Sequence, residues 1–370
     1  MPKDETKEIQ KMLLELGERL GLISKKEERI HCHDAYAPFY DAVWYLDLSK
    51  YFNMDELKPL FVHNPQLLES MKRIPFAGFE VEGSTTSTKN QIGNFANLHS
   101  GHFLFNFEIV NNAAAGKEND TYRRGMKVYR YCNQIFASKN DIFMDKSHLE
   151  ESIKNLPKRL DNNIHIENYN KNQRGTYGGE KAESLKMFAE ILPMLQKSKL
   201  SIMQNKEPLL CSLKYETLKQ SFSTNTSEYG KFYLSQNYYS DPVSFEVKNS
   251  TKAKDSFYIP KIDVEAGFNM PNGFFLWLKS LGNALKNDAV NYPIVYGITN
   301  EIITSYFISL IAIEMECSIN KHLNGGICNM ANFAYSGVLV TTQDASKHID
   351  FLSQELGINN VTYYKCEELN

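Results

Sequence analysis

Residues 78–84 read GFEVEGS and residues 40–44 read YDAVW, and each stretch places carboxylates within or beside an otherwise apolar run. Burying an unpaired carboxylate is costly, so such residues usually bind a metal ion or a charged partner. Glu80 and Glu82 are two residues apart and would point to the same face of a strand. Asp41 would complete a three-carboxylate cluster if the strands are neighbours. Hard oxygen ligands of this kind suit Mg²⁺.

The sequence around these stretches predicts a compact α/β unit over residues 1–140. Apolar residues recur at helical spacing in some segments, and aromatic and β-branched residues dominate others. The first helix should end at Gly21. Prolines interrupt residues 48–74, which should loop out between two strands. The expected helices are 5–22, 88–98 and 121–137, and the expected strands are 39–46, 76–82 and 102–110.

The pattern is weaker beyond residue 140. Residues 160–182 are dense in Asn, Gly and charge, which indicates a long loop or a domain junction. The run 302–313 is too short for a membrane span and is typical of a buried helix. At the tail we expect a strand, a helix that stops at Gly357, and a second strand. These three elements fall at 335–342, 344–356 and 361–365, and no internal repeat is evident.

Composition narrows the class of protein. The chain has 370 residues, of which 42% are hydrophobic, enough for two domains or one large elaborated domain. No signal peptide is evident, and the six cysteines form no CxxC pair, so we expect reduced thiols and a cytoplasmic protein. The net charge of −3 argues against a nonspecific nucleic-acid binder. Residues 117–260 carry 23 Lys+Arg and 17 Asp+Glu, and this basic middle either faces phosphates or reflects ordinary surface variation.

An Asp on one strand, a Glu-x-Glu on the next, and then a hydroxyl-rich turn and a helix resemble the PD-(D/E)XK nuclease superfamily. Within it, residues 79–85 (FEVEGST) together with 93–98 (GNFANL) are similar to a type II restriction endonuclease. The resemblance covers about residues 1–137. It implies a mixed sheet flanked by helices, which is the restriction-endonuclease-like core of an α/β protein. Residues 141–370 would then form a large α+β region for DNA recognition and dimerisation.

The resemblance also implies roles for individual residues. Asp41 matches the motif Asp and Glu80 the second acid, so both would bind Mg²⁺. Glu82 occupies the usual Lys position, where it would help to hold the metal or take a proton from the attacking water. Lys89 on the following helix would be a displaced catalytic lysine or an ordinary surface lysine. The implied activity is site-specific hydrolysis of double-stranded DNA to 5′-phosphate and 3′-hydroxyl ends by a homodimer, with no membrane partner.

Sequence recognition requires side chains that can read base edges. Asn, Gln and Arg do this most often. Gln91 and Asn94 on the helix after the acidic strand are candidates for DNA contacts. The polar loop beyond residue 160 supplies three more, namely Asn172, Gln173 and Arg174.

Other interpretations of the same residues remain open. The fold could serve a different defence or repair nuclease, or a DNA-binding protein that has lost catalysis, since Glu replaces the usual Lys. The three acids could instead be solvated charges on an exposed strand edge. A second motif-like string contains Asp241, Glu246 and Lys248. Its Asp is only five residues before its Glu, which leaves no room for a turn between two strands.

Overall fold

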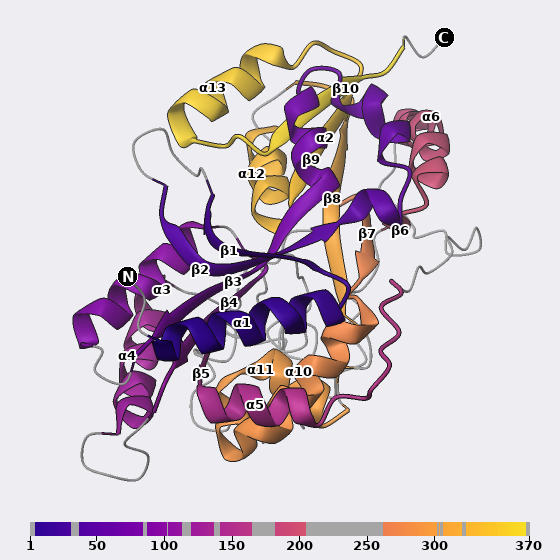
Figure 1. The fold of residues 1–370 in the computed structure, drawn as a ribbon. Coiled ribbons are helices and arrows are strands. Elements are labelled where there is room, and N and C mark those ends of the chain that lie inside the picture. The colour runs from indigo at the N-terminus through magenta and orange to yellow at the C-terminus, as the bar shows by residue number, and fades with distance from the viewer. Residues whose placement is uncertain are drawn as a thin grey trace, which may run out of the picture.

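The computed structural model is an α/β protein with two mixed five-stranded sheets flanked by helices (Figure 1). It describes residues 4–30, 37–83, 87–101, 103–112, 120–136, 141–164, 182–204, 262–301, 303, 306–319 and 323–367. The predicted DNA contacts Asn172, Gln173 and Arg174 lie outside these residues, and so does the string 241–248. No helix in the described ranges is both long and apolar enough to cross a membrane.

The first sheet has the order β1-β2-β3-β4-β5. β2 runs antiparallel to both of its neighbours, β1 and β3, whereas β4 and β5 continue the sheet in parallel with β3. Its elements are α1 (Asp4–Arg19), β1 (Ile23–Arg29), β2 (Phe39–Asp47), β3 (Arg73–Glu82), α3 (Thr88–Ser100), β4 (Phe105–Val110), α4 (Thr121–Phe136), β5 (Asp141–Asp145) and α5 (Lys146–Lys154).

The strands and helices predicted for this sheet are present, with additions. β1 was not predicted, and β5 lies just past the boundary expected at residue 140. α1 packs its apolar stripe on the sheet, where the Trp44 indole N–H donates to the Leu13 carbonyl at 3.0 Å. The chain turns away at Gly21, whose φ of 78° suits glycine, as predicted. The insert between β2 and β3 forms two 3₁₀ helices and α2 (Pro65–Lys72).

The second sheet has the order β6-β7-β8-β9-β10. β6, β7 and β8 are antiparallel neighbours, and β9 and β10 continue in parallel with β8. Its elements are α6 (Ala182–Ser198), β6 (Ser201–Gln204), β7 (Val264–Asn269), α10 (Asn272–Leu285), the 3₁₀ helix Lys286–Asn291, α11 (Pro293–Thr299), β8 (Phe307–Glu316), α12 (Leu323–Phe333), β9 (Ser336–Thr341), α13 (Ser346–Leu356) and β10 (Val361–Lys365).

The two sheets repeat one topology. In each, a helix precedes three antiparallel strands, a helix leads to a fourth strand, and another helix leads to a fifth. Each also carries a helical insert between its second and third strands. The absence of an internal repeat, inferred from sequence, is therefore wrong at the level of fold.

The run 302–313, expected to be a buried helix, lies mostly in the central strand β8. Nine of the ten residues of β8 are buried. A strand covered on both faces gives a continuous apolar run without alternation, so periodicity alone cannot distinguish it from a buried helix. Its isoleucines favour the strand.

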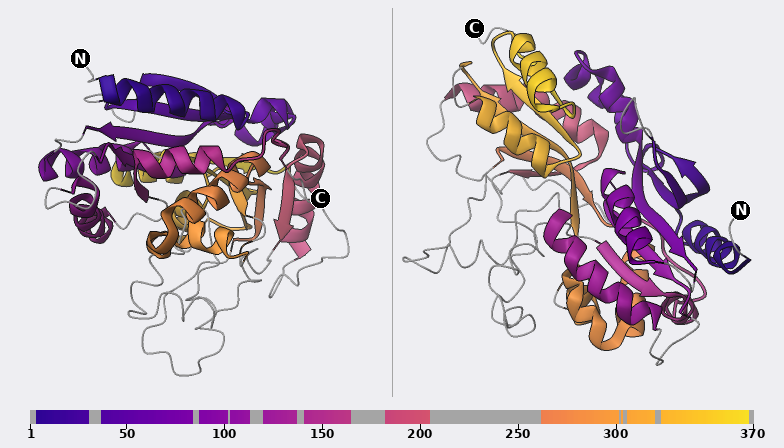
Figure 2. Two further views of the ribbon diagram at one scale, coloured as in Figure 1. Left: turned by 60° about the horizontal axis from the view of Figure 1, so that its bottom comes forward. Right: turned by 90° about the vertical axis from the view of Figure 1, so that its left-hand side faces the viewer.

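The helical inserts are exchanged between the two halves (Figure 1). The insert of the first half lies on the second sheet, where Phe52 packs 5.6 Å from Phe268 and His63 stacks on Tyr363 at 4.1 Å. The insert of the second half lies on the first sheet, where Trp277 packs 5.2 Å from Phe107. Figure 2 shows α10 and α11 beside α5. These two helices of the second half are thus far in sequence from the first sheet, on which they lie.

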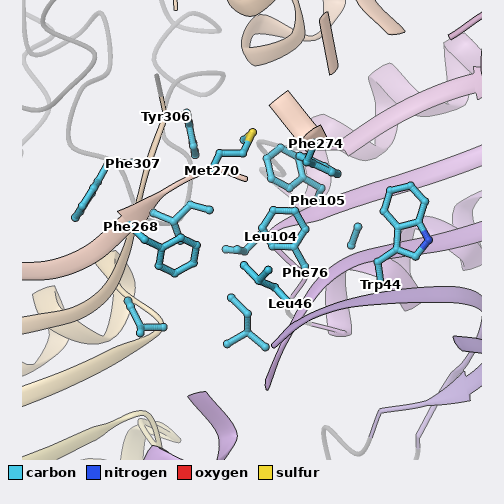
Figure 3. Close-up of a cluster of buried hydrophobic side chains, with 14 of the residues drawn as sticks. Trp44, Leu46, Phe76, Leu104, Phe105, Phe268, Met270, Phe274, Tyr306 and Phe307 are labelled. Atoms are coloured by element: carbon cyan, nitrogen blue, oxygen red, sulfur yellow. The ribbon is translucent and has the colours of Figure 1, made fainter. Parts of the chain in front are cut away.

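One apolar core joins the two sheets (Figure 3). Phe76 and Phe105 of the first sheet meet Phe274 of α10 with ring centroids 4.8 and 4.9 Å apart. Trp44 contacts Trp277 at 5.2 Å. The two halves are therefore fixed to each other by buried aromatic surface.

Candidate metal centre

Asp41 and Glu80 lie side by side in the middle of the first sheet. Ala42 pairs with Phe79 in antiparallel register, which sets the preceding Asp41 opposite Glu80. The Oδ2 atom of Asp41 accepts the backbone N–H of Val81 at 2.7 Å, and its Oδ1 atom accepts the amide of Gln10 on α1, also at 2.7 Å. Strand pairing and two hydrogen bonds thus hold this carboxylate beside Glu80.

Glu80 is buried, with 6% of its surface exposed. Burial first, and the neighbouring Asp41 carboxylate second, raise the pKa of Glu80 to about 9. Burial also raises the pKa of Asp41. Asp41 is partly buried, and two adjoining carboxyl groups so far withdrawn from water do not both ionise readily without a counter-charge, so they hold a proton or take up a cation.

The helix α3 supplies two amides to this face of the sheet. The side-chain amide of Asn94 donates to Glu82 Oε1 at 2.9 Å, and that of Asn97 lies 3.5 Å from Glu80 Oε1. Ser87 caps the start of α3 by accepting the N–H of Asn90. Asn94, which was predicted to contact DNA, donates a hydrogen bond to Glu82 in this structure.

A fourth acid, Glu108 on β4, was not predicted. β3 and β4 are parallel, and Glu108 pairs with Glu80. Glu108 is fully buried, and neither of its carboxyl oxygens has a hydrogen-bond partner among the described residues. Burial, followed by the charges of Glu82 and Glu80, raises its pKa well above the ordinary value. A Glu inside the apolar run FNFEIV is the same signal that identified Glu80.

The remaining predicted residues of this half lie on α3. Lys89 is exposed in the first turn of the helix. Gln91 is fully buried, and no hydrogen bond to its side-chain amide is found in the described part of the chain. This position does not suit the DNA contact predicted for Gln91.

The acids do not lie on an exposed edge, since β2 lies between β1 and β3, and β3 lies between β2 and β4. That alternative is wrong for Asp41 and Glu80. As the side chains stand, no three His, Cys, Asp or Glu residues in the described ranges are grouped closely enough to hold a metal ion. Binding one would require the carboxylates to turn toward a common point. Their donor set is suitable, because it consists of hard oxygens and includes the two unpaired oxygens of Glu108.

Comparisons with protein-family models, curated proteins and solved structures found no match to this chain.

Proposed function

We propose that the chain is a Mg²⁺-dependent, sequence-specific DNA endonuclease of restriction type, with a PD-(D/E)XK-like core in its first half. The observation that carries the proposal is the trio Asp41, Glu80 and Glu108. The three acids sit on adjacent strands of one sheet, Glu80 and Glu108 buried and Asp41 partly buried, with a raised pKa in each case. Perturbed, buried acids of this kind are enriched at functional sites.

The order of elements also supports this function. The acids lie in a mixed sheet flanked by α1 and α3, and a mixed sheet flanked by helices is the coarse architecture that the resemblance implies. The helix α3 follows the acidic strand in the chain, and its amides reach back to the acids.

In the proposed reaction, Asp41 and Glu80 would hold the divalent ion. A bound Mg²⁺ supplies positive charge beside the phosphodiester and lowers the pKa of water. Water adds to phosphorus as the bond to the 3′ oxygen breaks, which leaves a 5′-phosphate and a 3′-hydroxyl. Glu82, oriented by Asn94, accepts the proton of the water. The exposed position of Lys89 favours Glu82 over Lys89 for this step.

The test is incubation of the purified chain with unmethylated phage DNA and Mg²⁺, beside an Asp41→Asn variant and an EDTA control. We expect discrete fragments that are absent from both controls, with ends that can be sequenced to give the target. A smear would indicate the alternative of a repair or structure-specific nuclease. DNA that is bound but uncut with every divalent metal tried would contradict catalysis and favour a DNA-binding protein on a nuclease-like fold.

A further inference from the structure

The second sheet repeats the acids of the first at corresponding strand positions. Val264 pairs with Ile313, which sets Asp263 opposite Glu314, as Asp41 stands opposite Glu80. The Oδ2 atom of Asp263 accepts the backbone N–H of Met315 at 2.9 Å, as that of Asp41 accepts the N–H of Val81.

The environment of the second set also matches. Only 9% of the surface of Glu314 is exposed. Glu80, at the corresponding position of the first half, is exposed over 6% of its surface. Glu316 follows two residues later, on the same face of β8.

Sequence motifs accompany the acids in both halves. Residues 79–84 read FEVEGS and residues 313–318 read IEMECS. Each is followed by a helix, and those helices contain NFAN (94–97) and NMAN (329–332). In the first half both asparagines reach the acids. If the acidic pairs of β3 and β8 were unrelated, we would not expect the same serine and asparagine residues to follow both at nearly the same spacing.

The first turn of α12 leaves room above Glu314. Among the described residues, a Cβ atom placed on Gly325 would meet nothing within 4 Å, and one on Gly326 would meet only Glu314 Cγ, at 3.8 Å. Two successive glycines thus keep side chains away from a buried carboxylate. This space suits a hydrated cation and a phosphate oxygen, which need close access to the acids.

The two halves contact each other as the subunits of a symmetric dimer do. In such an interface, an element of one subunit rests on its partner and the equivalent element of the partner returns the contact. Here the insert of the first half packs on the second sheet, and the insert of the second half packs on the first. Each insert also donates a hydrogen bond to the other half, since the Asn53 N–H donates to the Ser198 carbonyl and the Tyr292 hydroxyl donates to the Phe143 carbonyl.

We propose that Asp263, Glu314 and Glu316, with their carboxylates turned toward a common point, form a second divalent-metal site. This site acts on the second DNA strand, so that one chain does the work of a nuclease dimer. The target of this site is a phosphodiester, as in the first half. This inference rests on the proposed function for its substrate, but not for the metal site. It replaces the expected homodimer with an internal pair.

Metal stoichiometry tests the second site without reference to cleavage. Mn²⁺ would be titrated into the intact chain and free ion followed by electron paramagnetic resonance, with Mg²⁺ as competitor. We expect two ions per chain, one in Asp263→Asn, one in Asp41→Asn and none in the double variant. Glu314→Gln provides a second variant of the new site, and the exposed Glu355→Gln provides a matched control that should keep two ions. These neutral replacements relieve carboxylate repulsion, so the variants should stay folded.

Plasmid cleavage then tests the assignment to the second strand. The unaltered chain should convert supercoiled DNA to linear product, and Asp263→Asn should stop at the nicked circle. A stoichiometry of one ion, unchanged in Asp263→Asn and Glu314→Gln, would overturn the second site. Linear product formed by Asp263→Asn at the unaltered rate would overturn its role on DNA. Two ions bound without any cleavage would support the site while refuting the proposed function.

Discussion

Asp41 accepts the backbone N–H of Val81, the residue that separates Glu80 from Glu82, at 2.7 Å. The main chain of β3 thereby holds the Asp41 carboxylate of β2 beside the residue that lies between the two glutamates. A buried acid receives this hydrogen bond only when strand pairing is in register, so the geometry of the site is a consequence of the sheet.

Asp41→Asn tests the first acid. The amide keeps the size of the side chain but removes the charge that would bind the metal. Cleavage should fall by more than about a hundredfold, because even outer partners of metal ligands cost 10–100-fold when removed. DNA binding should persist in a mobility-shift assay with Ca²⁺ in place of Mg²⁺. Cleavage at the unaltered rate would rule out Asp41 as a ligand.

Glu108→Met tests the unpaired buried carboxyl group. Methionine fills a similar volume without leaving polar atoms unsatisfied, so in EDTA the free energy of unfolding should rise by about 1–3 kcal/mol. The same variant should bind Mg²⁺ more weakly. Urea denaturation and metal titration measure the two effects. A loss of stability would mean that Glu108 has a structural partner.

Glu80→Gln tests the pH dependence of stability. The folded chain holds the Glu80 proton up to about pH 9, whereas the ordinary pKa is 4.5. The folded state binds more protons between these values, so the free energy of unfolding should fall as pH rises through this window. In EDTA, melting temperatures taken from pH 5 to pH 9 should decline less in Glu80→Gln than in Glu355→Gln. Identical slopes would contradict the raised pKa.

Asn94→Ala and Lys89→Ala test whether Glu82 or Lys89 takes the role of the missing motif lysine. Asn94 is changed because it orients Glu82. Asn94 donates to Glu82 at 2.9 Å, so its loss should lower the cleavage rate by about 10–100-fold. Lys89 is exposed, and its loss should change the rate little at low salt. Single-turnover cleavage measures both variants. The opposite order of effects would move the catalytic role from Glu82 to Lys89.

Trp277→Ala tests whether the halves unfold together. The Trp277 ring packs against Trp44 and Phe107 of the first sheet, and truncation of a buried aromatic costs about 3–5 kcal/mol. We expect one unfolding transition by calorimetry, shifted to lower temperature as a whole. Two separate transitions, of which only one shifts, would show that the sheets are independent.

Much of the first sheet could be predicted because its signals are local. The aromatic and β-branched residues around Asp41, the aromatic strand before Glu82 and the glycine exit at Gly21 each depend on neighbouring residues, and all three are present. Glu108 carried a comparable local signal in a buried strand. It went unrecognised because no motif includes it.

The proposed second site could not be predicted from patterns of neighbouring residues in the sequence. Glu314 and Glu316 follow a run with no alternation, which was interpreted as a helix, and Asp263 is separated from them by α10 and α11. Only the pairing of β7 with β8 brings the three together. The exchange of inserts is less predictable still, since it depends on contacts between residues more than a hundred positions apart, such as Tyr292 and Phe143.

The duplicated topology has a consequence for the DNA sequence that such an enzyme could read. Two identical subunits related by a dyad favour a palindromic target, because the symmetry of the protein mirrors that of the site. The halves of this chain are covalently joined and differ in sequence, so each could evolve its own base contacts. A nuclease built this way is free to recognise an asymmetric site and still cut both strands.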